Sequence, residues 1–330
     1  MVYVYKKMIA GKPYYYLRAS SISKGKSVVK DIAYLGNSIE NAKKEIERLP
    51  QFKDKIEKSY RKIRLFLESN HYLEGAQKAK LKHDDFLKEN QAIVEACALH
   101  YNKAFKKLDA LTQKEILDNF IVEYAFNTTA IEGNTIGLKE ARGLLEEGLT
   151  PKDKTLREIH DLQNTKRVFE SLDLKRQLSR ELIKEIHAGL LENIDSRNEY
   201  RIRDIMVTKS RFKPSPYYKV REDMDFLLEW FDKNKKLHPF VLAVIFHHKF
   251  EKIHPFMDGN GRTGRMLMNF ILLKNNYPPE ILQKKHRSEY LEILNEADKA
   301  FITEAKPEHY AGLIAFATAE LNETYWNNFL

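Results

Sequence analysis

The segment formed by residues 254–265 gathers side chains that suit chemistry on phosphates. Its sequence is HPFMDGNGRTGR. Gly259 and Gly261 allow a close approach of the backbone to a ligand, and we expect a helix to begin just after them, where free N–H groups favour anions. Arg262 and Arg265 are three residues apart, so they share a face of the first helical turn and can each fork onto phosphate oxygens.

Two more residues of this segment supply acid–base and metal chemistry. His254 has the pKa range of a general base that works near neutral pH. Asp258 lies at the rim of the expected anion site, and a single carboxylate beside phosphates suits Mg²⁺. A phosphate cradle, a metal ligand and a base within one short segment indicate phosphoryl or nucleotidyl transfer.

Two other interpretations, a dinucleotide-binding site and a metal site built from histidines, are weaker. Gly259, Gly261 and Gly264 fit the dinucleotide-binding fingerprint, but that fingerprint requires a preceding strand. Here the segments on both sides, 239–252 and 266–273, have the pattern of helices. Outside this segment, three histidines have no partner at the spacing of metal ligands: His238, His286 and His309.

The composition predicts a mainly helical, globular protein. Among 330 residues, Gly (13) and Pro (10) are scarce, which favours long helices with few turns. Cys97 is the only cysteine, so neither an intrachain disulfide nor a cysteine-based metal site is possible. No apolar run approaches the roughly 18 residues of a membrane span. We therefore expect a cytoplasmic protein without a membrane partner.

The first part of the chain is predicted to form a small basic β-meander over residues 1–37. Its strands are expected at three short runs rich in Val, Ile and Tyr, residues 2–5, 14–19 and 28–34. Ser38 is placed to cap a following helix. Residues 38–110 then form a helical region or linker with two or three long helices.

Residues 111–330 are predicted to form the catalytic domain. Thr112 and Glu115 form a capping box for a helix over 112–131, and further helices are expected to start at Thr150-Pro151 and Ser179. Residues 204–218, with two prolines and several aromatic or β-branched residues, read as a hairpin or flap. Amphipathic helices are expected at two later stretches, 223–232 and 239–252.

The net charge of +9 is concentrated at one end of the chain. Residues 1–100 hold 20 Lys+Arg and 12 Asp+Glu, whereas residues 101–330 hold 36 and 35. A basic module joined to a near-neutral one suggests an acidic partner for the first third: nucleic acid, an acidic protein face or a membrane surface. The alternative is a basic surface that only contacts solvent.

The segment at 254–265 resembles the motif of the Fic (filamentation induced by cyclic AMP) family, His-x-Phe-x-Asp/Glu-Gly-Asn-Gly-Arg-x-x-Arg. All of the specified positions are present: His254, Phe256, Asp258, Gly259, Asn260, Gly261, Arg262 and Arg265. The resemblance extends over about residues 110–320 and includes Tyr200-Arg201 and Tyr277-Pro278-Pro279. One departure is Asn198, where relatives often have Gly.

The resemblance implies a Fic-type helical bundle that transfers AMP from ATP, with Mg²⁺, to a Ser, Thr or Tyr hydroxyl of a target protein. It implies that His254 takes the proton of that hydroxyl and that Phe256 anchors the loop. Asp258 would hold Mg²⁺ and the flap would hold the target's backbone. The phosphates would be bound by Gly259, Asn260, Gly261, Arg262 and Arg265. Tyr290 is a candidate for a contact with adenine.

A second motif, upstream, resembles the inhibitory Ser/Thr-x-x-x-Glu-Gly/Asn sequence of many Fic proteins. Here it is carried by Thr128, Glu132 and Gly133. The resemblance implies that Glu132 pairs with Arg265 and takes the place of the γ-phosphate, so that the enzyme inhibits itself.

Several functional alternatives stay open at the level of sequence. The same fold could remove AMP from a target, or transfer another nucleotidyl group or phosphocholine. Self-modification and a homodimer are also expected from the resemblance. A different class of function is a nucleic-acid-binding regulator that acts through residues 1–100, whose binding would depend steeply on salt.

Overall fold

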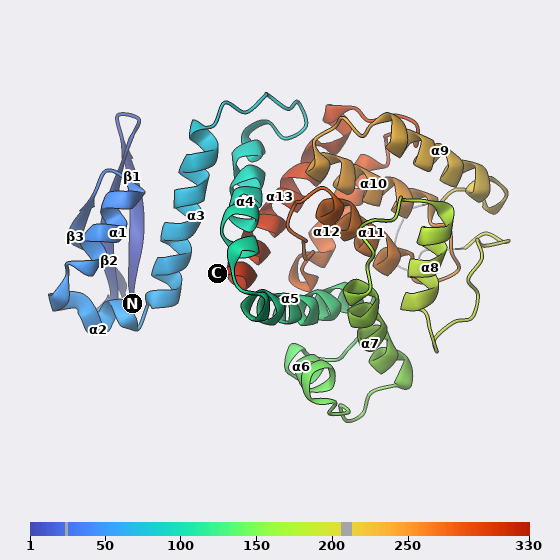
Figure 1. Cartoon of the computed structure of the whole chain (residues 1–330), viewed down its shortest axis with the longest axis horizontal. Coiled ribbons are helices and arrows are strands. Elements are labelled where there is room, and N and C mark those ends of the chain that lie inside the picture. Colours follow the sequence, from blue (N-terminus) through green and yellow to red (C-terminus); the bar gives the residue numbers. More distant parts are fainter. Residues whose placement is uncertain (24–25, 206–212) are drawn as a thin grey trace.

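The computed structural model describes residues 1–23, 26–205 and 213–330. Over these ranges the chain forms thirteen α-helices, several short 3-10 helices and one three-stranded sheet. The sheet lies at one end of an elongated molecule, and the helices form the remainder (Figure 1). The predicted mainly α class with a small N-terminal meander is confirmed.

The sheet is an antiparallel meander in the order β1-β2-β3. Its strands are β1 (Val2–Ile9), β2 (Lys12–Ser23) and β3 (Lys26–Gly36). The strands are longer than predicted because the hairpin ladder continues past the apolar residues, and Ile9 still pairs with Lys12 next to the turn. Gly11 takes the left-handed conformation that this tight turn requires, with φ 76°.

One face of the sheet packs against helices α1 (Ile39–Glu47) and α3 (Tyr60–Lys78). Ser38 caps α1 as predicted, since its hydroxyl accepts the Asn41 N–H at 3.1 Å. The shared core is built from the following buried residues: Val2, Val4, Tyr15, Leu17, Leu35, Ile39, Ala42, Ile63 and Leu67.

Residues 38–110 contain two long helices, α3 and α4 (Gln91–Lys103), in agreement with the predicted two or three. The remaining helices there, α1 and α2 (Lys53–Glu57), are short. Pro50 separates these two by starting a 3-10 turn, because proline lacks the N–H that a continuing helix needs. Helix α3 lies between the sheet and α4, so it joins the two parts of the molecule (Figure 1).

A second and larger core belongs to the helical body. At its centre α10 (Pro239–Ile253) packs against α11 (Asn260–Lys274), and both are buried over most of their length. A helix that is buried on nearly all sides belongs in the interior. The surrounding helices are α5 (Ala110–Ile131), α6 (Leu138–Glu147), α7 (Leu156–Glu170), α8 (Arg180–Leu190), α9 (Val220–Lys233), α12 (Arg287–Ala297) and α13 (Pro307–Phe329).

Two predicted helix starts are wrong and one is confirmed. Helix α5 begins at Ala110, because the Asp109 carboxylate accepts the Thr112 N–H at 3.0 Å and caps the helix before Thr112 can. Helix α7 begins after Thr155, which forms a capping box with Glu158, and not at Thr150-Pro151. Ser179 caps α8 as predicted.

The predicted flap at 204–218 lies partly outside the described residues, which omit 206–212. Of its described residues none is in a strand, and a 3-10 turn begins at Tyr217. The two ends of the segment are joined, since Asp204 accepts the Tyr217 N–H at 2.8 Å. The Ser215 N–H donates to the carbonyl of Lys252 at 3.3 Å, which fixes the segment beside the end of α10.

Over the described ranges, no helix combines the length and the apolar character that crossing a bilayer requires.

Candidate active site

Residues 254–265 form the junction between the two central helices. Helix α10 ends at His254, whose left-handed backbone (φ 52°) turns the chain into a short loop. Helix α11 begins at Asn260, so Arg262 and Arg265 are helical as expected, and Asn260 and Gly261, which were expected to precede the helix, belong to it as well. A pocket of about 850 Å³ lies over this junction, and its lining includes Glu132, Glu251, His254, Asp258, Arg265 and Tyr290.

The loop is held from below by Phe256 and Asn260. Phe256 is fully buried and its ring stacks on that of His187, with centroids 3.6 Å apart. The Asn260 side chain accepts the Phe256 N–H at 2.8 Å and donates to the Phe256 carbonyl at 2.9 Å. The side chain of Asn260 therefore fixes the loop, and its contribution to an anion site is the backbone N–H at the start of α11.

Arg201, to which sequence reasoning gave no role, holds the other side of the loop. Its side chain is fully buried and donates from Nε to the carbonyl of His254 at 2.8 Å. Its backbone N–H donates to the carbonyl of Pro255 at 2.9 Å. The signal was present in the sequence as Tyr200-Arg201, but its purpose appears only when these residues meet the loop.

His254 faces the pocket with 18% of its side chain exposed. Its Nδ1 lies 3.3 Å from the carbonyl oxygen of Glu251 and 3.7 Å from a carboxylate oxygen of the same residue. Burial lowers the pKa of His254 to about 4, although the negative charge of Glu132 opposes this shift. The imidazole is therefore neutral at physiological pH, as a proton acceptor must be.

Glu251, one turn before His254, is a second residue without a role in the sequence analysis. Burial raises the pKa of its carboxyl to about 8. One of its oxygens, Oε1, is buried and has no hydrogen-bond partner among the described residues. A protonated carboxyl next to the imidazole can orient the ring without adding a full negative charge.

Asp258 lies at the rim of the pocket with a third of its side chain exposed (33%). It accepts the Gly259 N–H at 2.6 Å and forms an ion pair with Arg157. Burial by itself would raise the pKa of Asp258, but the guanidinium groups of Arg262 and Arg157 outweigh it and hold this pKa below its usual range. An ionised carboxylate in this position is a suitable oxygen ligand for Mg²⁺.

Arg262 points into the protein and not into open solvent. Its side chain is 3% exposed and forms an ion pair with Asp161 of α7, while Nη2 lies 3.6 Å from Asp258. A cation so deeply buried requires such a partner. Asp161 was missed in the sequence, because a lone aspartate on a helix 101 residues away has no local signal.

Arg265, one turn further along α11, meets the end of α5. Its Nε donates to the Thr128 hydroxyl at 2.7 Å, and Nη2 donates to the Thr128 carbonyl at 2.9 Å and to the Glu132 carboxylate at 2.6 Å. Burial would raise the pKa of Glu132, but Arg265 reverses this effect and lowers it. The predicted pair of Glu132 and Arg265 is thus present in the structure.

The Glu132 carboxylate lies directly over the beginning of α11. A Cβ atom placed on Gly261 would be only 2.0 Å from its Oε1. Gly133 follows with φ 106°, a backbone conformation that favours glycine and lets the chain leave α5 at this point. The carboxylate therefore occupies the place at a helix N-terminus that an anionic ligand would take.

Tyr290 contributes to the pocket wall from α12, but its side chain is nearly fully buried, at 2% exposure. Its hydroxyl is 2.7 Å from Nε2 of His247. This contact accounts for His247 as a core histidine. A role of Tyr290 toward adenine stays a prediction.

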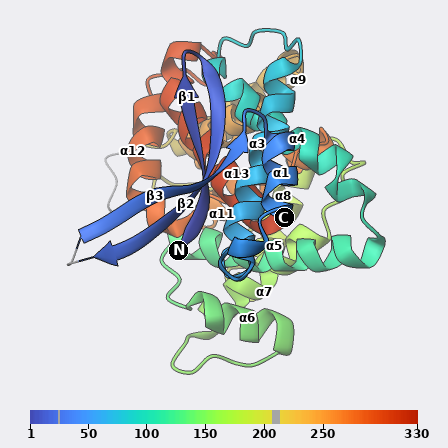
Figure 2. The ribbon, with the colours of Figure 1, turned by 90° about the vertical axis from the view of Figure 1, so that its left-hand side faces the viewer.

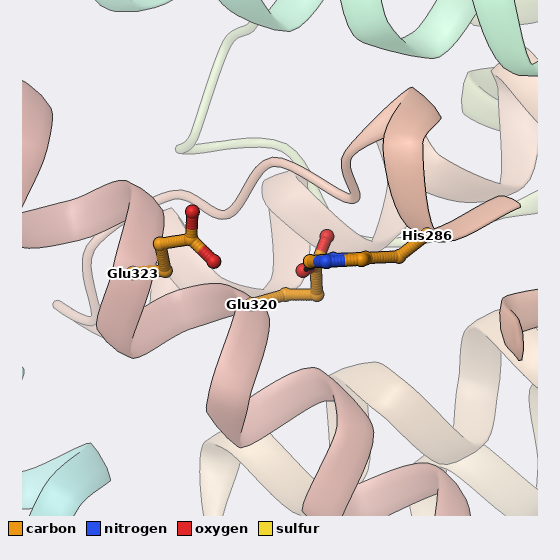
Figure 3. A group of neighbouring side chains, drawn as sticks. All are labelled: His286, Glu320 and Glu323. Atoms are coloured by element: carbon orange, nitrogen blue, oxygen red, sulfur yellow. Dashed lines mark hydrogen bonds and ion pairs between the residues drawn. The ribbon is translucent and has the colours of Figure 1, made fainter. Parts of the chain in front are cut away.

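The segment before α12 is fixed by a group of charged residues, His286, Glu320 and Glu323 (Figure 3). His286 Nδ1 lies 2.6 Å from Glu320, a partner 34 residues away that the sequence did not indicate. Glu323 is engaged by Lys285. Although their ligand atoms lie within 4.8 Å of one another, these existing pairs identify the group as a structural clamp between α12 and α13.

The clamp also positions Arg287, which holds the end of α5 beside the pocket. It places Arg287 so that its Nε donates to the carbonyl of Ile131 at 2.6 Å, next to Glu132. The end of α5 is thus held from both sides, by α11 and by α12.

Comparison with known proteins agrees with this geometry. Residues 177–272 match the family model described as the Fic/DOC family. Protein adenylyltransferase fic-1 of Caenorhabditis elegans is 35% identical over 184 residues, which are 53% of this chain and 36% of that protein. Protein adenylyltransferase Fic of Culex quinquefasciatus is 28% identical over 308 residues, 84% of this chain and 60% of that protein. The chain thus covers less than two thirds of the length of each of these relatives.

Solved structures show the same fold. A Fic domain containing signaling protein from Bacteroides thetaiotaomicron superposes with a TM-score of 0.64 at 24% identity, covering 71% of this chain and 95% of that one. Fic-1 from C. elegans superposes with a TM-score of 0.58 at 26% identity, covering 72% of each chain.

Proposed function

We propose that this chain, which carries a Fic/DOC domain at residues 177–272, transfers AMP from ATP to a hydroxyl side chain of a protein and is held inactive by Glu132. The observation that carries this proposal is the common pocket of His254 and Arg265, in which Glu132 already occupies the anion position. The curated relatives described above are named protein adenylyltransferases, which supports the same reaction.

The chemical step needs a base and an electrophilic phosphorus in line. His254, neutral because burial lowers its pKa, takes the proton of the target hydroxyl. The hydroxyl oxygen then bonds to the α-phosphorus of ATP, and the bond from this phosphorus to the bridging oxygen breaks. Pyrophosphate leaves, and AMP stays on the target.

The leaving group gains negative charge that the beginning of α11 is built to receive. The backbone N–H groups of Asn260 and Gly261 point along the helix axis toward the pocket. Arg265 supplies a guanidinium from the same helix once Glu132 has left it. Arg262, locked by Asp161, adds positive potential from beneath and stiffens the helix start.

Asp258 is the residue that would hold Mg²⁺, together with phosphate oxygens of the nucleotide. Its low pKa keeps it ionised, and its partial exposure leaves it accessible. When bound, the ion neutralises charge on the α- and β-phosphates. Arg157 pairs with Asp258 in the present arrangement and would have to move for the ion to bind.

The target would approach over residues 204–218. The described end of this segment contributes Arg203, Asp204 and Ile205 to the pocket lining, so a target chain aligned with it would reach His254. We infer that an extended target segment adds to it through backbone hydrogen bonds. Self-modification would use the same approach by a hydroxyl of another copy, and a homodimer is one way of supplying it.

Inhibition follows from the position of one carboxylate. Glu132 neutralises Arg265 and fills the place over Gly261, so the terminal phosphate of ATP meets negative charge where it needs positive charge. ATP then binds with its α-phosphorus out of line with the attacking hydroxyl. Removal of Glu132 should release the reaction.

A test is to incubate the protein with Mg²⁺ and ATP labelled at the α-phosphate. We expect weak labelling of protein by the wild type, strong labelling by Glu132→Gly, and none by Glu132→Gly/His254→Ala. Glu147→Gly is a matched control, since Glu147 is an exposed glutamate that also ends a helix, and it should label like the wild type. Equal labelling of wild type and Glu132→Gly would contradict the proposed inhibition.

Removal of AMP from a modified target is the second candidate. It is favoured by one observation: the ionised Glu132 is 43% exposed and acts electrostatically on His254, so a water molecule between them could be activated. In the assay above, AMP removal predicts that pre-labelled Glu132→Gly protein loses its label on addition of wild type but not on addition of His254→Ala.

A further inference from the structure

The outer face of the N-terminal sheet, which α1 and α3 leave uncovered, is rich in tyrosine. Helices α1 and α3 cover the inner face of the sheet. When the molecule is viewed from the sheet side, the strands lie in front of the helices (Figure 2). Residues of alternating strand positions that point away from Val4 and Leu17 form this outer face. Five of them are tyrosines: Tyr3, Tyr5, Tyr14, Tyr16 and Tyr34.

The strand register brings these tyrosines into adjacent rows. Tyr16 of the central strand pairs with Tyr5 on one side and with Tyr34 on the other. The ring centroids of Tyr16 and Tyr34 are 5.3 Å apart, and those of Tyr14 and Tyr34 are 6.4 Å apart. Tyr34 is 54% exposed, so its ring is open to a ligand. The result is an aromatic platform on β2 and β3, with Tyr5 of β1 next to it in the register.

Positive charge borders this platform. Residues 1–36 hold seven Lys+Arg and one acidic residue. Lys7 is exposed and pairs with Tyr14 across the strands, and Lys12 is exposed at the nearby turn. The guanidinium of Arg18 lies 3.4 Å from the ring centroid of Tyr5, while Asp31 forms an ion pair with it. The lysines are thus the charges available to a ligand, and Arg18 stiffens the platform.

The composition of the face favours one kind of ligand. A face that only contacts water needs neither aromatic rings nor a single sign of charge. A second copy of the same face would bring like charges together. Aromatic rings bordered by lysines match a strand of nucleic acid with unpaired bases, because bases stack on tyrosine and phosphates meet the lysines. A duplex offers its phosphates but keeps its bases stacked on one another.

We propose that the outer face of the β1–β3 sheet binds single-stranded nucleic acid, with bases on Tyr16 and Tyr34 and phosphates on Lys7 and Lys12. The sheet lies at one end of the molecule (Figure 1), and the pocket at His254 is lined by residues of the helical body between 130 and 298, so this surface is separate from the pocket. The inference does not depend on AMP transfer, and it assigns a purpose to the concentration of basic charge in the first third of the chain.

The test uses the full-length chain and fluorescein-labelled 20-nucleotide single strands of DNA and RNA, with the duplex of the same sequence as comparison. We expect single-strand binding, measured by anisotropy, that weakens steeply as salt rises. Tyr16→Leu and Tyr34→Leu should each lower the affinity about tenfold, whereas the Phe variants at these positions retain it. Lys7→Gln/Lys12→Gln should flatten the salt dependence.

Two controls separate this binding from folding and from the other site. Tyr60→Leu changes a tyrosine that is 59% exposed on α3, outside the sheet face, and should bind like the wild type. His254→Ala should also bind like the wild type, even if AMP transfer is lost or was never present. Circular dichroism checks that the sheet variants are folded.

The proposal is overturned by no binding at low salt, by stronger binding to the duplex, or by binding that the tyrosine substitutions leave unchanged. A tyrosine-dependent dimer in sedimentation without nucleic-acid binding would also overturn it, since the face would then serve a second copy.

Discussion

Two arginines one turn apart on α11 meet their carboxylates in very different surroundings. Arg262 pairs with Asp161, and both side chains are buried, at 3% and 12% exposure. Arg265 is equally buried, but its partner Glu132 is 43% exposed at the end of a helix. Asp161 is enclosed with its arginine, whereas the Glu132 side chain can turn into solvent while Arg265 keeps its hydrogen bonds to the Thr128 hydroxyl and carbonyl. One pair therefore builds the site, and the other can regulate it.

The largest predicted effect is the difference in stability between variants of Asp161 and variants of Glu132. Asp161→Asn leaves the Arg262 cation buried without its counter-charge, and we expect a loss of about 3–5 kcal/mol in the free energy of unfolding. Glu132→Gln removes a partly exposed charge, and because Arg265 keeps its two hydrogen bonds to Thr128 we expect a smaller loss, about 1–2 kcal/mol. Urea denaturation of both variants measures this difference. Equal losses would mean that the two pairs do not differ in the way we describe.

The second prediction concerns the effect of pH on His254. The folded pKa of His254, about 4, is below its unfolded value of about 6.5, so the unfolded chain binds a proton first on acidification. The stability that neutral His254 provides is complete above pH 6.5 and is lost as the pH falls toward 4, by about 2 kcal/mol at pH 4.5.

Comparison of the wild type with His254→Gln isolates this contribution from the other buried histidines. The difference in unfolding free energy between the two proteins should shrink between pH 7 and 4.5. Because Glu132 raises the pKa of His254, Glu132→Gly should lower that pKa further, which NMR titration can detect. A higher pKa in Glu132→Gly would show that the two groups do not interact as the structure indicates.

A third prediction sharpens the contact between Glu132 and α11. Alanine at Gly261 would place Cβ against the Glu132 carboxylate, so Gly261→Ala must displace this side chain. We expect a coupling energy of about 1–2 kcal/mol in a double-mutant cycle of Gly261→Ala with Glu132→Gly, measured by thermal unfolding. Additive effects would place the carboxylate elsewhere in solution.

The smallest predicted effect is on the Mg²⁺ dependence of labelling, and it concerns Arg157 and Asp258 at the rim of the pocket. Arg157 competes for Asp258 with any bound Mg²⁺, but both side chains of this pair are partly exposed. Arg157→Ala should lower the Mg²⁺ concentration for half-maximal labelling about threefold in the Glu132→Gly background. Arg176→Ala, which breaks an exposed pair with Glu185 away from the pocket, is the control and should leave the Mg²⁺ dependence unchanged.

The sequence predicted those parts of the site that lie close together in the chain. Residues 254–265 and the Thr128–Gly133 motif were found because their chemistry is local. Asp161 was not found, and Arg201 was noted without a role, because these residues reach the motif from 101 and 53 residues away. A single carboxylate or arginine has no signal until packing has placed it.

The fold, too, was predictable where the signal is local and not where tertiary contacts decide. Runs rich in Val, Ile and Tyr predicted the three strands, and Ser38 and Ser179 predicted two helix starts correctly. Thr112 failed as a start because Asp109, three residues earlier, is an equally good cap. Asn260 and Gly261 were expected to precede α11 because both are poor helix formers, but they are its first two residues. The Asn260 side chain is held there by its hydrogen bond from the Phe256 N–H.

The claim that Glu132 takes the place of a terminal phosphate is tested most directly by calorimetric titration with ATP and with ADP. Two proteins are compared, one with Glu132 and one with Glu132→Gly, and both carry His254→Ala to prevent turnover. We predict that Glu132→Gly tightens ATP binding at least tenfold, about 1.4 kcal/mol, and changes ADP binding little. An unchanged ratio of ATP to ADP affinity would contradict the account, because Arg265 would then have no phosphate to exchange for Glu132.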